Sequence, residues 1–428
     1  MHLNLICYFP IIEVFYAVTL LSLSFISWEK FMHKRILNVF FILFLCFSAF
    51  NAYAELITSE KYGYTIDFPE GFAMEDGTDD ETMFLFTHTM MPLHAIIRVY
   101  PSKICETAKD AFSLTFSKLN ASFECDEVLW RNQKCAIANF TMAPAMMQSV
   151  QSGQAVAIPL AKYKSVLVLL AYAPKELSFD LGQIIASIID SVMIDTGSFK
   201  ESGPLTAYAF PSSGKKDVTL TVAGRKITSQ MDKSDKEASQ FIIDREFAVF
   251  RIYAANNSPL MFDAWQRFYR IIAKDALGRF KKLSFDLYSA LFSEASRRDE
   301  SNPNAALAQM LLNWVQYFDY AQVSSTPDKA DFVNLPAVID GASSDCDSRS
   351  MLLAVLLKNM GMDTCLLVSP YYRHAMLGIC LDGKLGQAFE IDGKKYLFGE
   401  TTGKDMTFGL IFADFPDKTK WLPVEFPF

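Results

Sequence analysis

Hydrophobic residues recur every three to four positions in four stretches of the second half of the chain, with polar residues between them in the first three. That spacing places apolar side chains on one face of a helix, so each stretch is predicted to be a helix that buries one face. The four stretches are residues 261–276, 280–295, 305–320 and 351–357. Gly361 follows the last of them and is a typical helix stop.

Shorter apolar runs follow this last helix and predict strands. They are separated by the dipeptides Asp382-Gly383 and Asp392-Gly393, which are typical turn signals between strands. The runs are residues 364–368, 375–381 and 395–398. Helices followed by strands predict an α+β fold, in which a helix packs on an antiparallel sheet in the C-terminal region.

The first half of the chain is predicted to form a small α/β module. Helices are expected at residues 108–119 and 177–193. Strands are expected at residues 62–69, 84–86, 95–100, 136–140, 155–158 and 165–172. This order, with the Tyr-x-Ile-x-Phe-Pro opening at Tyr64, resembles the modules of Mog1 and PsbP-like proteins. The resemblance implies a binding or packing module without chemistry of its own.

Residues 196–204 are rich in Gly, Ser and Pro and predict a linker. After it, apolar residues in the stretches 218–222, 241–243 and 246–253 predict a β-rich insert. The expected domains are therefore the module at residues 55–196, the insert at residues 205–256 and a C-terminal domain at residues 257–428.

The N-terminus contains an export signal. Basic residues after Met32, an apolar run at residues 36–47 and a small-residue site ending at Ala54 predict a signal peptide over residues 32–54. Residues 1–31 are then an upstream extension, if translation begins at Met32; the alternative is a membrane segment. The protein is expected to be exported, to the periplasm or outside the cell, either free or with an N-terminal membrane anchor.

The composition and charge of the chain exclude some classes of binding partner. The 428 residues carry a formal charge of −8, and no Lys/Arg cluster occurs beyond the N-terminus, so nucleic acid is not an expected partner. No CxxC, HExxH or Gly-rich phosphate loop is present, so neither a metal nor a cofactor is expected. Three cysteines lie in each half of the exported part. A Cys125–Cys135 disulfide across a hairpin is the favoured pair, although the sequence leaves the pairing open.

A thiol, an imidazole and a carboxylate follow one another in the C-terminal region, at Cys346, His374 and Glu400. A thiol nucleophile needs a nearby base, and that base needs a third group to orient it. Asp345 or Cys346 is predicted to begin the helix, where the free amides and the helix dipole favour a thiolate. His374 opens one predicted strand and Glu400 follows another, so both can lie at the sheet end that faces this helix.

Several motifs in this order resemble the transglutaminase-like superfamily, a papain-like thiol fold, in its bacterial and archaeal branch. The motifs are Val315-Gln316, Pro336-Ala337, Asp345-Cys346-Asp347, His374-Ala375 and Glu400-Thr401-Thr402. The resemblance implies that Cys346 is the nucleophile, His374 the base and Glu400 the orienting carboxylate, with Gln316 beside the oxyanion. Two departures are Met376, where many members have Trp, and Glu400, where many have Asp.

These observations together predict an exported thiol-dependent acyl-transfer enzyme, a cysteine peptidase or amidase that acts on a protein or peptide without a cofactor. One alternative is a transglutaminase that crosslinks proteins. The other is a catalytically weak module that keeps the fold and binds peptides or the cell envelope. The substrate and the oligomeric state are left open by the sequence.

Overall fold

The computed structural model describes residues 56–426, except residues 145–146, 148, 256–257 and 323–328. Helices and antiparallel sheets both occur, which confirms the α+β class. The described residues belong to one compact unit. The predicted signal peptide at residues 32–54 and the segment 1–31 lie outside the described residues, and no helix within the described part is long and apolar enough to cross a membrane.

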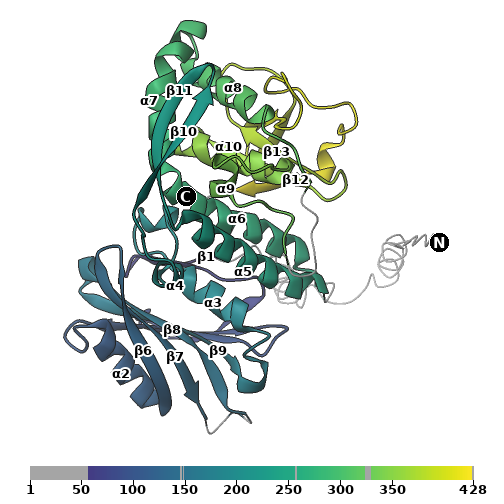
Figure 1. The fold of residues 1–428 in the computed structure, drawn as a ribbon. Coiled ribbons are helices and arrows are strands. Elements are labelled where there is room, and N and C mark those ends of the chain that lie inside the picture. Colours follow the sequence, from purple (N-terminus) through teal and green to yellow (C-terminus); the bar gives the residue numbers. More distant parts are fainter. Residues whose placement is uncertain (1–55, 145–146, 148, 256–257, 323–328, 427–428) are drawn as a thin grey trace, which may run out of the picture. The chain divides into compact units, whose positions relative to one another are not determined.

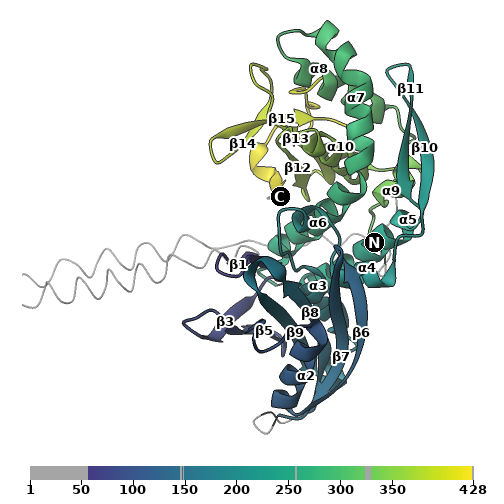
Figure 2. The same cartoon turned by 90° about the vertical axis from the view of Figure 1, so that its left-hand side faces the viewer.

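A seven-stranded antiparallel sheet forms the N-terminal module (Figure 1). Its strand order is β3 (Phe72–Gly77), β4 (Met83–His88), β5 (His94–Pro101), β9 (Ser165–Pro174), β8 (Gln151–Leu160), β7 (Gln133–Met142) and β6 (Ala121–Trp130). Helix α2 (Ala108–Leu119) covers one face and α3 (Gly182–Asp190) the other (Figure 2). The central strand β9 is therefore buried on both faces, which explains its almost uniformly apolar sequence.

The two faces of this sheet also separate the cysteines that the sequence favours as a pair. Cys135 lies opposite Val128 and packs in the core on the α3 face, whereas Cys125 lies opposite Ala138 and contacts the core on the α2 face. The predicted Cys125–Cys135 disulfide is therefore wrong. All six cysteines among the described residues are free thiols, Cys346 included.

The segment after the linker is only partly β. A hairpin of β10 (Lys215–Val222) and β11 (Arg225–Asp232) follows α4 (Pro204–Ala209), but the strands predicted at residues 241–243 and 246–253 are wrong. Both stretches lie in helix α5 (Asp235–Ala255), in which one stripe of buried residues recurs every three or four positions. These residues are Ala238, Ile242, Glu246, Val249 and Tyr253. The buried acid in the middle of the stripe hides the helical period in the sequence. The domain boundaries at residues 196, 205 and 257 stay predictions.

The predicted C-terminal helices are confirmed as α6 (Met261–Arg279), α7 (Lys281–Arg298), α8 (Pro303–Gln316) and α10 (Cys346–Asn359), with the short α9 (Leu335–Ile339) before α10. A five-stranded antiparallel sheet has the order β14 (Ala388–Ile391), β15 (Lys394–Gly399), β13 (His374–Ile379), β12 (Thr364–Ser369) and β16 (Leu422–Glu425). Helix α10 packs between this sheet and helices α6, α7 and α8 (Figure 1). Every residue from Ser348 to Leu357 is buried, so α10 is the central element of this half.

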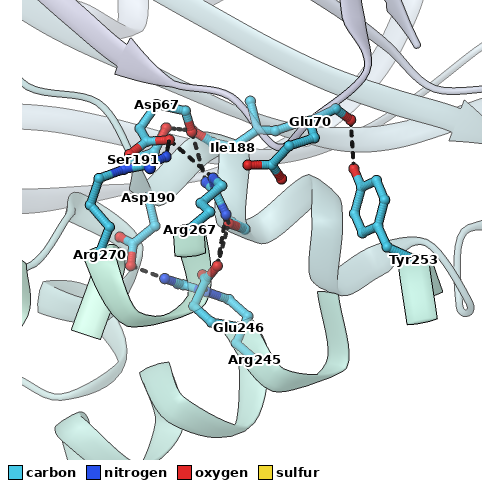
Figure 3. A network of polar contacts seen from close by, with 11 residues as sticks. Asp67, Glu70, Ile188, Asp190, Ser191, Arg245, Glu246, Tyr253, Arg267 and Arg270 are labelled. Carbon is cyan, nitrogen blue, oxygen red and sulfur yellow. Dashed lines mark hydrogen bonds and ion pairs between the residues drawn. The ribbon is translucent and has the colours of Figure 1, made fainter. Parts of the chain in front are cut away.

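Buried ion pairs connect the N-terminal module to α5 and α6 (Figure 3). Nε of Arg267 lies 3.0 Å from Oδ1 of Asp67, which belongs to β2 (Tyr64–Asp67), a strand paired with β1 (Leu56–Ser59). Nη1 of Arg267 lies 2.8 Å from Oε2 of Glu246, and Nη1 of Arg245 lies 2.7 Å from Oδ2 of Asp190. These charged side chains are almost fully buried, so each depends on its partner for the solvation that it has lost.

Candidate active site

Cys346 is the first residue of α10, and Asp345 is its N-cap. Oδ1 of Asp345 accepts hydrogen bonds from the amide of Ser348 at 3.1 Å and from its hydroxyl at 2.7 Å. The cap satisfies an amide that has no partner within the helix and so fixes the residue at which the helix begins. The thiol is thereby placed in the first turn, as the sequence predicts, and Cys346 is 8% exposed.

His374 and Glu400 lie at one edge of the five-stranded sheet. His374 begins β13, Glu400 directly follows β15, and these strands are antiparallel neighbours with Leu377 opposite Gly399. Nε2 of His374 lies 2.7 Å from Oε2 of Glu400. A carboxylate only accepts hydrogen bonds, so Nε2 carries the proton and Nδ1 is left as the basic nitrogen.

Both carboxylate oxygens of Glu400 have hydrogen-bond partners. Its Oε1 accepts hydrogen bonds from the amide of Thr402 at 2.7 Å and from the Thr402 hydroxyl at 2.5 Å. The side chain is fully buried, and burial by itself raises its pKa, but the hydrogen bonds from His374 and Thr402 outweigh burial and lower the pKa of Glu400 below its usual value. Glu400 is therefore a fixed carboxylate that can orient His374.

The first turn of α10 lies against this edge of the sheet. The hydroxyl of Ser350, one turn after Cys346, lies 3.3 Å from the carbonyl oxygen of Ala375 and 2.9 Å from Oγ1 of Thr401. The fold thus brings the segments of Cys346, His374 and Glu400 together. Among the described residues, however, the hydrogen bond of the thiol goes to Oδ1 of Asp347 at 3.2 Å, and none joins Cys346 to His374.

The electrostatic environment of the thiol differs from the one expected at a helix N-terminus. Burial and the neighbouring Asp347 raise the pKa of the Cys346 thiol well above its usual value, against a lowering contribution from the Ala375 backbone. Burial and Asp347 also raise the pKa of Asp345 to about 6. Burial first, and the acidic neighbours second, therefore favour the neutral thiol over the thiolate that a helix N-terminus alone would favour. No group of three or more His, Cys, Asp or Glu in the described part is arranged to hold a metal ion.

The side-chain amide of Gln316 contacts two backbone carbonyls. Its Nε2 donates to the carbonyl oxygens of Glu400 at 2.8 Å and Met406 at 3.0 Å, so both amide hydrogens are engaged. The residue is 1% exposed. An oxyanion donor must point at the oxygen that becomes charged. Both amide hydrogens of Gln316 are engaged elsewhere in this structure, and its oxyanion role stays a prediction. In this structure Gln316 positions the segment that carries Glu400.

Two aromatic side chains from the C-terminal segment contact His374, and no sequence motif marks them. The ring of Phe415 stacks on His374 with centroids 4.9 Å apart, and the Trp421 ring lies edge-on at 6.3 Å. They come from the segment after β15, whereas Met376, at the position where many transglutaminase-like proteins have Trp, is buried on the sheet. The C-terminal aromatic residues were detectable as a group in the sequence, but nothing in their spacing connects them to His374.

Solved structures that are similar to about a third of this chain include PsbP and Mog1. Cyanobacterial PsbP from Synechocystis is 11% identical, covers 34% of this chain and 95% of its own, and has a TM-score of 0.29. The Ran-binding protein Mog1p from Saccharomyces cerevisiae is 10% identical, covers 33% and 94%, and has a TM-score of 0.26. Both match the resemblance expected for this module.

A protein from Bacteroides thetaiotaomicron with a known crystal structure has 9% sequence identity to this chain. The match covers 80% of this chain and 88% of that protein, with a TM-score of 0.19. No protein-family model and no curated protein sequence matches the chain. The comparisons give no support for the transglutaminase-like resemblance, which stays a proposal.

Proposed function

We propose that the protein is a thiol-dependent acyl-transfer enzyme with a transglutaminase-like domain, most simply a cysteine peptidase or amidase. The observation that carries this proposal is the 2.7 Å contact between Nε2 of His374 and the fully buried Glu400, at the sheet edge that meets the first turn of α10. A buried carboxylate that fixes one nitrogen of an imidazole leaves the other nitrogen as a directed base. Cys346 supplies the nucleophile.

The proposed reaction divides amide cleavage into two steps. Nδ1 of His374 takes the proton from Cys346 while the sulfur bonds to the carbonyl carbon, and the carbonyl electrons move to its oxygen. As the oxygen electrons return, the carbon–nitrogen bond breaks, and His374 gives its proton to the leaving amine. Water, deprotonated by His374, then cleaves the thioester and restores the thiol. A second amine in place of water gives crosslinking.

One observation favours the alternative of a binding module with little catalysis. The Cys346 thiol donates to Asp347 and its pKa is raised by burial and that carboxylate, so the resting thiol is a poor nucleophile. We also propose that the predicted signal peptide at residues 32–54 directs export of the protein, which is then either free or anchored to the membrane at its N-terminus.

The test measures two products of the full-length protein. A peptide pool is analysed for cleaved fragments by mass spectrometry, and a fluorescent primary amine is used to detect incorporation into a glutamine-containing protein. Fragments that vanish in Cys346→Ser and His374→Ala, but persist in Cys380→Ser, support hydrolysis. Amine incorporation with the same dependence selects crosslinking. Absence of both products from the natural sequence rejects the enzyme and favours the binding module.

A further inference from the structure

The thiol of Cys346 has a neighbour that the triad does not use. Asp347 follows it in the first turn of α10, and its Oδ1 accepts the thiol hydrogen bond at 3.2 Å. The other oxygen, Oδ2, accepts a hydrogen bond from the phenol of Tyr269. Tyr269 belongs to α6, far from Asp347 in the sequence, so the contact is made by the tertiary fold.

Tyr269 is held firmly enough to fix the carboxylate. It is 2% exposed, and its ring contacts three other aromatic rings. The centroid distances are 5.6 Å to Trp265, 5.1 Å to Phe268 and 6.2 Å to Phe332. A buried phenol usually finds one hydrogen-bond partner, and here that partner is Asp347. With one oxygen on Tyr269, the other oxygen of Asp347 is directed at the sulfur.

The two acids that flank Cys346 have different tasks. Asp345 is occupied as the helix cap, with Oδ1 on the amide and hydroxyl of Ser348. Asp347 makes no cap and contacts the thiol itself. Negative charge near Cys346 is therefore common to both residues, while the hydrogen bond to sulfur belongs to Asp347 alone. This difference supplies a matched control.

We infer that Asp347 is a positioning residue that holds Cys346 as a neutral thiol, hydrogen-bonded to Oδ1 of Asp347 instead of His374, and that this hydrogen bond must break before the proton passes to Nδ1 of His374. The inference rests on the proposed thiol chemistry. In the resting state the sulfur keeps its proton and donates it to Oδ1 of Asp347. In the reactive state the same proton moves to Nδ1 as the sulfur bonds to the carbonyl carbon, which leaves an imidazolium. The raised pKa of the Cys346 thiol agrees with the first state.

The experiment follows site-specific alkylation of Cys346 by iodoacetamide in the full-length protein, read by mass spectrometry from pH 5 to 11. Asp347→Asn removes the charge but keeps the size of the side chain, and Asp345→Asn removes a charge while an asparagine still caps the helix. We expect Asp347→Asn to move the alkylation midpoint about one to three pH units lower, the usual effect of one adjacent charge. Asp345→Asn is expected to move it clearly less.

An unchanged or higher midpoint in Asp347→Asn overturns the inference, as does an equal shift in both variants. Asp347→Ser replaces Asp347→Asn if the latter fails to fold, and Asp347→Glu, which restores the charge, is expected to return the midpoint toward that of the natural protein. His374→Ala separates this result from the proposed function. If Asp347→Asn shifts the midpoint but adding His374→Ala changes nothing, Asp347 controls the thiol and the Cys346–His374 pair fails.

Discussion

Replacing Arg267 by Met tests whether buried charges hold the module to the helices (Figure 3). The guanidinium donates to Oδ1 of Asp67 at 3.0 Å, to the Asp67 carbonyl at 2.7 Å, to Oε2 of Glu246 at 2.8 Å and to Ser187 at 2.9 Å. Arg267 is 1% exposed. Methionine fills much of the same volume without charge, so the change removes these hydrogen bonds while limiting the loss of packing.

The expected loss of stability in Arg267→Met depends on which cations Asp67 and Glu246 still contact. Asp67 retains Arg270, whose Nε and Nη2 each lie 2.9 Å from its carboxylate, and Glu246 retains Nε of Arg245 at 2.7 Å. Breaking a buried ion pair by removing one partner costs about 3–5 kcal/mol, because the other charge is left without solvation. Since neither acid is left wholly without a cation, we expect about 3 kcal/mol, the lower end of that range.

The assay is urea unfolding at pH 7, monitored by tryptophan fluorescence. The urea midpoints of the variants are compared provided that the dependence of the unfolding free energy on urea concentration is the same. Arg297→Met is the matched control, because the Arg297 side chain is 68% exposed and its ion pair with Glu294 is on the surface. Surface pairs contribute little to stability. We expect Arg297→Met to unfold at nearly the same urea concentration as the natural protein. If Arg267→Met does so too, this network does not stabilise the fold.

Three further changes test single side chains. Burial raises the pKa of Glu70 to about 7 from its usual 4.5, and neither carboxylate oxygen accepts a hydrogen bond from the described residues. Between pH 4.5 and 7 the Glu70 carboxyl therefore stays protonated in the folded protein but loses its proton in the unfolded chain. The free energy of unfolding falls as pH rises through this range. Glu70→Gln should therefore be more stable than the natural protein by at most about 3 kcal/mol at pH 8 and equal to it near pH 4, in urea midpoints at both values. Asp345→Ala should lose about 1 kcal/mol of stability in thermal unfolding, and Asp345→Asn almost none. Glu400→Gln should lower turnover of a cleaved peptide roughly 100-fold or more without a comparable change in KM, because His374 loses its orienting anion; a KM effect alone would contradict this role.

The sequence predicted the local structure around the candidate site well. Helix starts, glycine stops and turn dipeptides are local signals, so the start of α10 at Cys346 and the start of β13 at His374 could be derived from neighbouring residues. Glu400 follows a strand that the turn at Gly393 introduces. The pairing of β13 with β15, which skips β14 in the chain, then places His374 beside Glu400, and that pairing is a tertiary choice that the local signals do not give.

Long-range contacts could not be predicted in this way. The hydrogen bond between Asp347 and Tyr269 joins two helices, and the amide of Gln316 reaches the carbonyl of Met406 across the fold. The side-chain direction of each depends on tertiary packing, which no local pattern encodes. The same reason explains α5: its stripe of buried residues includes Glu246, which is buried only because Arg245 and Arg267 neutralise it.

Asp67 is fully buried and Asp347 half-buried, and their carboxylates meet opposite kinds of hydrogen-bond donor. Asp67 meets two guanidinium groups, and although burial raises its pKa, these cations lower it to about 2, so its charge is retained and can hold two elements together. Asp347 meets a phenol and a thiol, which are neutral donors, and burial raises its pKa. Neutral donors stabilise a carboxylate less than cations do, so the Asp347 contact is the weaker of the two and the easier to break. If Cys346 is the proposed nucleophile, its contact with Asp347 has to break, and a hydrogen bond from a neutral donor meets that need, whereas the arginine pairs of Asp67 keep two elements joined.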